Sequence, residues 1–262
     1  MLVALLGFNL SFFIMCANGD FLGCDSSLPL TRRNFLETAL GGSAVLALAA
    51  NSIFAAPGDA PAPKAQNVLT PDEALERLRK GNERYVSGVM NRHDFATERE
   101  ALAGGQNPFA AILSCADSRI APEYAFDTGR GDLFVVRLAG NFLNDDGLAS
   151  LEYGVKFLGI PLLVVLGHEK CGAVDAALKV VKDGAALPGH LPGLVERIRP
   201  AVQTAIGKAG DPLENAIREN VLLNVAKLKG ATPVVNEFVE GKKVRVVGGI
   251  YKLGDGRIDW IG

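Results

Sequence analysis

Short apolar runs alternate with helical stretches along the second half of the chain, and this alternation restricts the possible folds. The stretches 147–157 and 172–181 have helical patterns. Runs rich in valine, leucine and isoleucine lie on either side of them, at 109–114, 133–138, 162–166 and 244–251. Runs that are apolar throughout predict strands buried on both faces, so we expect an α/β fold with a mainly parallel central sheet flanked by helices. A Gly254-Asp255-Gly256 turn then leads into 257–261, for which we expect an antiparallel edge strand.

The segment before these strands predicts an N-terminal helical arm. Thr70 can cap a helix, Pro71 suits its first position, and Glu73 stands three residues after the cap. We therefore expect an amphipathic helix over 71–87 and a shorter helix from about Thr97. A further helix is expected over 213–228, where apolar residues recur at helical spacing.

Composition excludes one class of partner. The 262 residues are 48% hydrophobic and 21% charged, which is typical of a globular protein. The formal net charge is -2 and the isoelectric point is near 6.0, so the chain has no basic field for nucleic acid. We expect no nucleic-acid partner.

The first 56 residues resemble a leader. TRRNFL at 31–36 precedes an alanine-rich apolar run at 39–50 and small residues at 54–57, a pattern that resembles a twin-arginine export signal. An ordinary amphipathic or anchoring helix is the alternative. A second apolar stretch at 2–17 is either an over-long translation start or an extra membrane segment. We expect 1–56 to be removed after recognition by the twin-arginine export machinery, which places the mature protein in the periplasm. A linker, 57–67, then precedes one catalytic domain, 68–262.

All the cysteine outside this leader lies in two motifs. Cys115 follows an expected strand, and His168 and Cys171 stand three residues apart after another. Two thiolates and an imidazole are ligands that zinc favours, and three protein ligands leave one coordination position open for catalysis. Two alternatives remain: the cysteines are small buried apolar residues beside a turn histidine, or they form a Cys115–Cys171 disulfide in an oxidising compartment. Export of a protein already folded would let zinc enter in the cytoplasm and protect both thiolates.

Two charged residues follow the first cysteine. Asp117 and Arg119 can form an ion pair beside the metal, in which the carboxylate accepts a hydrogen bond from the nucleophile and the guanidinium keeps the carboxylate off the zinc. The alternative is a salt bridge that only stabilises the turn. In open parallel sheets ligands bind beyond the carboxyl ends of strands, where Cys115 and His168 are expected.

The motifs CADSR at 115–119 and HEKC at 168–171 resemble those of the β-class carbonic anhydrases. The resemblance extends over 68–262 and includes a terminal hairpin, GGIYKLGDGRIDWI at 248–261. It implies one Zn²⁺ per subunit, reversible hydration of CO2 to bicarbonate and a proton by attack of zinc-bound hydroxide, and a homodimer or homotetramer. It also implies a closed, inactive state in which Asp117 becomes the fourth zinc ligand.

The same resemblance implies a substrate site. Gln106 and the backbone N–H of Gly172 would bind the bicarbonate oxygens, and Phe134, Ala139 and Tyr153 would form an apolar CO2 pocket across a subunit boundary. Two other functions stay open: a CS2 or COS hydrolase on the same fold, and a zinc- or bicarbonate-binding protein without turnover.

Overall fold

The computed structural model describes residues 68–93, 98–99 and 102–262. The twin-arginine-like segment, the rest of the expected leader, the linker and the start of the helix expected near Thr97 lie outside these residues. Within the described part, no helix combines the length and the apolar character that a membrane span requires.

Five strands form one sheet in the order β2-β1-β3-β4-β5. Neighbouring strands are parallel except for β4 and β5, which are antiparallel, so the predicted α/β class and its antiparallel edge strand are confirmed. The strands are β1 (Ala110–Ser114), β2 (Leu133–Arg137), β3 (Leu162–His168), β4 (Arg245–Tyr251) and β5 (Ile258–Ile261).

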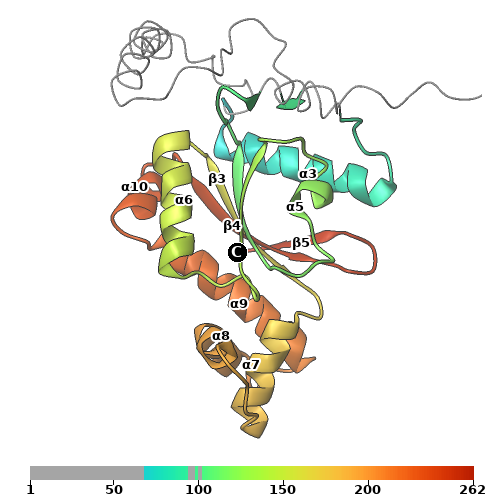
Figure 1. Ribbon diagram of the computed structural model, residues 1–262, viewed down its shortest axis with the longest axis vertical. Coiled ribbons are helices and arrows are strands. Elements are labelled where there is room, and N and C mark those ends of the chain that lie inside the picture. The colour runs from blue at the N-terminus through green and yellow to red at the C-terminus, as the bar shows by residue number, and fades with distance from the viewer. Residues whose placement is uncertain (1–67, 94–97, 100–101) are drawn as a thin grey trace, which may run out of the picture. The chain divides into compact units, whose positions relative to one another are not determined.

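Helices cover both faces of this sheet (Figure 1). On one face Leu75 and Leu78 of the first helix pack against Ile112 and Val164. The helices α6, α9 and α10 cover the other face, where Leu113 and Val165 are buried. The described helices are α3 (Pro71–Ser87), α5 (Pro122–Ala125), α6 (Asp145–Leu158), α7 (Gly172–Asp183), α8 (Leu191–Ala205), α9 (Pro212–Lys229) and α10 (Val234–Glu240).

The expected helix over 71–87 forms as α3, and its N-terminus has the predicted capping box. The backbone N–H of Glu73 donates to the Thr70 hydroxyl, and the Glu73 carboxylate accepts from the Thr70 backbone N–H at 2.8 Å. Gly88 ends the helix in a left-handed conformation with φ 73°. Both ends of α3 are thus specified by local sequence.

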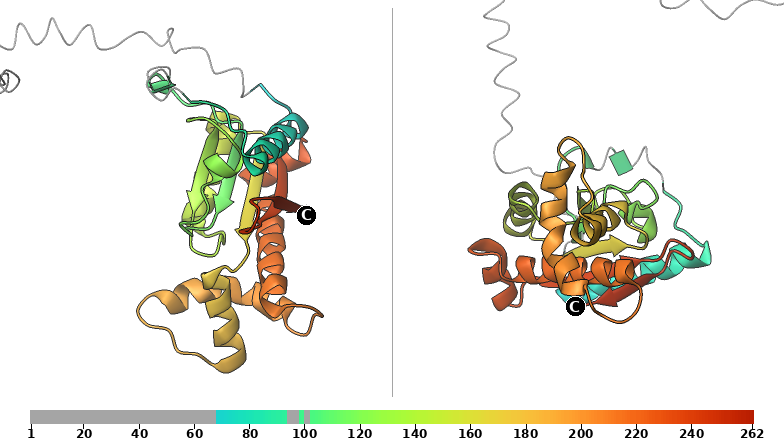
Figure 2. Two further views of the ribbon diagram at one scale, coloured as in Figure 1. Left: turned by 90° about the vertical axis from the view of Figure 1, so that its right-hand side faces the viewer. Right: turned by 90° about the horizontal axis from the view of Figure 1, so that it is seen from below.

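Beyond the carboxyl ends of the strands, α7 and α8 form a lobe together with α9 (Figure 2). The apolar interior of this lobe includes Cys115 and Cys171, together with Val174 and Ile198. Helices α5, α8 and α10 were not expected from the sequence. Helix α8 begins with Leu191-Pro192-Gly193 and contains Pro200, residues that ordinarily indicate loops, but its buried face packs against α7 and α9.

Candidate metal centre

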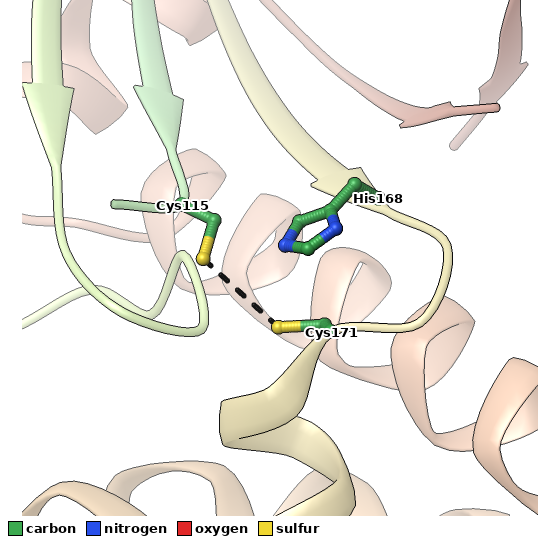
Figure 3. A group of neighbouring side chains, drawn as sticks. All are labelled: Cys115, His168 and Cys171. Carbon is green, nitrogen blue, oxygen red and sulfur yellow. Dashed lines mark hydrogen bonds between the residues drawn. The ribbon is translucent and has the colours of Figure 1, made fainter. Parts of the chain in front are cut away.

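Three potential metal ligands meet at the carboxyl edge of the sheet (Figure 3). Cys115 directly follows β1, and His168 is the last residue of β3. These two strands are parallel neighbours, with Ser114 opposite Leu166, so their carboxyl ends lie side by side. Cys171 is the N-cap residue of α7 and follows a tight turn in which Lys170 has a positive φ of 51°. The turn returns the chain so that Cys171 faces His168.

The spacing of the three side chains is that of a metal site and not of a disulfide. Their ligand atoms all lie within 4.8 Å of one another, and the two sulfurs are 4.0 Å apart. A disulfide requires about 2.0 Å, so the alternative of a Cys115–Cys171 disulfide does not hold and both cysteines are free. Two thiolates on one tetrahedral zinc, with Zn–S bonds of about 2.3 Å, would be about 3.8 Å apart.

The histidine has one ring nitrogen available. Its Nδ1 lies 2.8 Å from the backbone carbonyl oxygen of Glu169, a contact in which Nδ1 donates and Nε2 keeps its lone pair. Nε2 is buried and has no hydrogen-bond partner. A buried polar atom without a partner is costly unless something else satisfies it. A metal ion between this nitrogen and the two sulfurs would do so, and the residues present therefore fit zinc.

The two thiols have different acidities. Hydrogen bonding from Cys171, with a smaller contribution from the Gly140 backbone N–H at 3.2 Å, lowers the pKa of Cys115 to about 4. The pKa of Cys171 is raised, first by its hydrogen bond to Cys115 and second by burial. The two sulfurs therefore share one proton until a cation replaces it.

The ion pair next to this centre is well formed. Asp117 Oδ1 accepts from Arg119 Nε at 2.9 Å, and Oδ2 accepts from Arg119 Nη2 at 2.7 Å. These hydrogen bonds hold the pKa of Asp117 well below its usual range. Asp117 Oδ2 is 3.8 Å from His168 Nε2, but among the described residues Asp117 does not belong to the group of mutually close ligand atoms. The carboxylate is thus turned to the guanidinium, next to the metal position.

A residue that the sequence reasoning missed holds the loop that carries this pair. Arg137, at the end of β2, donates from Nε to the Cys115 carbonyl at 2.9 Å. Its Nη2 donates to the carbonyls of Asp117 at 2.7 Å and of Ile120 at 2.8 Å. The sequence signal that could have indicated this role was an arginine at the carboxyl end of an expected strand, the edge at which the loop after Cys115 was also expected. Its guanidinium satisfies carbonyls of a loop that has no strand partner of its own.

Comparison with known proteins agrees with this geometry. The carbonic anhydrase family matches residues 110–258. A carbonic anhydrase 2 of Mycobacterium tuberculosis is 40% identical over 188 residues, which are 71% of this chain and 91% of the relative. The chain belongs to the β-carbonic anhydrase family.

Solved β-carbonic anhydrases have the same fold. A Coccomyxa β-carbonic anhydrase in complex with acetazolamide aligns with a TM-score of 0.57 and 27% identity, over 71% of this chain and 84% of the other. One from a study of two tetrameric enzymes of Sordaria macrospora aligns with a TM-score of 0.58 and 25% identity, over 64% of this chain and 87% of the other. The agreement over most of each enzyme supports the α/β assignment of the whole described domain.

Two of the five expected substrate residues of this β-carbonic anhydrase lie near the metal ligands. Ala139 precedes Gly140, whose backbone N–H contacts the Cys115 sulfur. Gly172 follows Cys171 as the first residue of α7, and the space where its side chain would project is open. Gly172 is exposed, and as the first residue of a helix it has a backbone N–H without an intrahelical partner.

The other three lie toward the amino edge of the sheet. Gln106 precedes β1, a five-residue strand that spans about 16 Å and has Cys115 at its far end. Gln106 and Tyr153 line one surface pocket together with Leu102 and Leu158. Phe134, near the start of β2, lies against Tyr153 with 6.4 Å between the ring centroids, and Tyr153 lies against Phe157 with 5.4 Å; both ring pairs are tilted. Tyr153 is 47% exposed and Phe157 is 74% exposed. One chain thus does not bring these side chains to its own metal ligands.

Proposed function

We propose that this protein catalyses the reversible hydration of CO2 to bicarbonate and a proton, with one zinc ion per chain. The observation that carries the proposal is the buried set of two free sulfurs and one unpartnered imidazole nitrogen beside the Asp117–Arg119 pair. Zinc held by Cys115, His168 and Cys171 supplies a Lewis acid that makes water a nucleophile near neutral pH.

Asp117 orients the nucleophile in this proposal. Because its pKa is lowered by the hydrogen bonds from Arg119, the carboxylate stays ionised at neutral pH and is a poor proton acceptor. It can instead accept a hydrogen bond from the attacking water and direct the oxygen lone pair towards CO2. Arg119 fixes the carboxylate through two side-chain hydrogen bonds and is itself held by the Lys170 carbonyl at 3.3 Å. Release of this clamp would free Asp117 to approach the metal as a fourth ligand.

The substrate contacts come from two places. The backbone N–H of Gly172 stands at the positive end of a 12-residue helix, which favours the negative charge that develops on bicarbonate. Ala139 would form part of the apolar wall for CO2. Gln106, Phe134 and Tyr153 would complete the site of a neighbouring subunit, which requires a homodimer or homotetramer. The exposed aromatic side chains Tyr153 and Phe157 support such an interface, and the relatives from Sordaria macrospora are described as tetrameric.

Stopped-flow CO2 hydration by purified protein of known zinc content tests the reaction. We expect acceleration in proportion to bound zinc. Release of sulfide from CS2 or COS, with little CO2 hydration, would assign the chain to those substrates instead. Zinc or bicarbonate binding without turnover of any of the three would make it a binding protein.

We also propose that the twin-arginine machinery exports the protein to the periplasm. The support is the sequence pattern over 31–57 alone. Cell fractionation of the wild-type chain and of a variant carrying Arg32→Lys and Arg33→Lys tests this. Export of both forms to the same extent would refute it.

A further inference from the structure

Two fully buried asparagines lie on α9, a helix that contributes no metal ligand. Asn220 and Asn224 are each 0% exposed and stand one turn apart, among the apolar side chains of Val221 and Val225. A buried amide is costly unless its hydrogen-bonding groups are satisfied. Their partners therefore indicate what the two amides do in the fold.

The hydrogen bonds of both asparagines lead to the segment 140–143, whose first residue contacts the Cys115 sulfur. Asn220 Nδ2 donates to the Gly140 carbonyl at 2.8 Å. Asn224 Oδ1 accepts from the Leu143 backbone N–H at 2.8 Å. Asn224 Nδ2 donates to the Asn220 backbone carbonyl at 2.7 Å and to Asn220 Oδ1 at 3.2 Å. The two amides thus bind each other and fix both ends of the segment 140–143.

The same segment contacts a metal ligand. The backbone N–H of Gly140 donates to the Cys115 sulfur at 3.2 Å. Gly140 has a positive φ of 87°, and a Cβ there would lie 2.5 Å from Ile198 Cδ1 and 3.2 Å from Ala173 Cβ. The residue is confined on the side of α7 and α8 by packing and on the side of α9 by Asn220. Its N–H consequently points at the sulfur in one fixed direction.

We infer that Asn220 is a positioning residue of the metal centre. By holding the Gly140 carbonyl, it keeps the Gly140 N–H directed at the Cys115 sulfur, and Asn224 supports Asn220 in that role. An N–H donor stabilises the negative charge of a thiolate, and it orients the sulfur towards His168 and Cys171. Loss of comparable outer partners costs about 10–100-fold in metal affinity. The inference rests on metal binding at the proposed site, but not on the identity of the substrate.

The test compares Asn220→Ala with Asn215→Ala in the full-length protein. Asn215 is on the same helix, and its Nδ2 donates to the Ala209 carbonyl at 3.1 Å, away from the metal ligands. Zn²⁺ dissociation constants are measured by competition with a chromogenic chelator. The sulfur-to-metal charge-transfer band is recorded after substitution with Co²⁺. We expect Asn220→Ala to raise the Zn²⁺ dissociation constant by about 10–100-fold and to shift the band. Asn215→Ala should change neither.

Two further variants keep the test decisive. If Asn220→Ala fails to fold, Asn220→Ser replaces it. The serine side chain is too short to reach the Gly140 carbonyl as the amide does, so the same rise in the Zn²⁺ dissociation constant and the same band shift are expected. Asn224→Ala keeps the direct donor to Gly140 and should weaken Zn²⁺ binding less. Zinc affinity of folded Asn220→Ala or Asn220→Ser equal to that of Asn215→Ala would overturn the inference. That result differs from failure of the proposed function, in which the wild-type protein itself would bind no zinc.

Discussion

At the carboxyl edge of the sheet, one chain assembles Cys115, His168 and Cys171 within 4.8 Å and buries all three. At the amino edge, the same chain leaves Gln106 and Tyr153 on an open pocket with exposed aromatic rings. The first edge is closed by adjacent strand ends, the start of α7 and the α9 amides. The second has no covering element among the described residues. Metal binding is therefore expected of a single chain, whereas the full substrate site is expected only of an assembly.

The largest effect should come from removing one ligand at the carboxyl edge. Cys171→Ser should abolish stoichiometric zinc binding and lower CO2 hydration to the rate of the uncatalysed reaction, because two ligands hold the ion too weakly. Zinc content by atomic absorption and stopped-flow hydration measure both effects. Ser114→Ala is the control, since the buried Ser114 hydroxyl has no hydrogen-bond partner and its loss should leave zinc bound. Full zinc occupancy in Cys171→Ser would contradict the ligand assignment.

The second largest effect should come from Asp117 at the same edge, and it separates orientation of the nucleophile from binding of the metal. Asp117→Asn should retain zinc but lower kcat/KM by about 10²-fold, because the amide can donate a hydrogen bond to the nucleophile where the carboxylate only accepts. Asp255→Asn, in the exposed turn before β5, is the matched control. Equal kcat/KM for the two variants would reduce the Asp117–Arg119 pair to a turn-stabilising salt bridge.

Substitutions at the amino edge should weaken the association of subunits. Replacing Tyr153 and Phe157 together by alanine should raise the dissociation constant of the assembly by about tenfold or more, since exposed aromatic residues dominate interface energies. Activity per zinc should fall as the assembly dissociates, and analytical ultracentrifugation measures the mass. Tyr124→Ala is the control, because Tyr124 is 64% exposed and belongs to α5. Full activity from a monomeric double variant would show that one chain completes its own site.

The smallest effect lies in α3, away from the ligands. Thr70→Ala removes the capping box and should lower Tm by about 2–4 °C without changing zinc content. Hydrogen bonds from the Thr70 backbone and hydroxyl lower the pKa of Glu73 from 4.5. A lowered folded-state pKa stabilises the protein above the unfolded pKa, and this contribution is lost as pH falls through the folded value. Thr70→Ala keeps the backbone N–H that donates to the Glu73 carboxylate and removes only the donating hydroxyl. The Tm difference from wild type should therefore narrow as pH falls from 4.5 through the folded-state pKa of Glu73. A constant difference would mean that the hydrogen bond from the Thr70 hydroxyl to the carboxylate contributes nothing.

The features that the sequence predicted well depend on local pattern. The capping box of α3 was read from Thr70, Pro71 and Glu73. Four strands were read from continuous apolar runs, and each began and ended within two residues of its expected bounds. The prediction that such runs are buried on both faces does not hold for β2, which is only partly buried in one chain. The three candidate metal ligands were singled out because two cysteines and a histidine at expected strand ends are a ligand set that zinc favours, and the structure brings them together.

The features that escaped prediction depend on contacts between distant segments. Helix α8 starts with proline and glycine, and it is stabilised by its packing on α7 and α9. Asn220 lies in a helix whose apolar stripe was recognised, but its bond to Gly140 spans 80 positions of sequence. Arg137 contacts carbonyls 17 to 22 positions away. No periodicity in a single sequence encodes such partners.

The central claim is that one chain binds one zinc ion through Cys115, His168 and Cys171 and that this ion enables CO2 hydration. The most direct test removes zinc from the full-length protein with a chelator, restores it in known amounts, and follows CO2 hydration by stopped flow on the same samples. We expect activity to vanish without zinc and to return linearly up to one equivalent per chain. Hydration by the zinc-free protein, or no hydration after one equivalent has bound, would contradict the account.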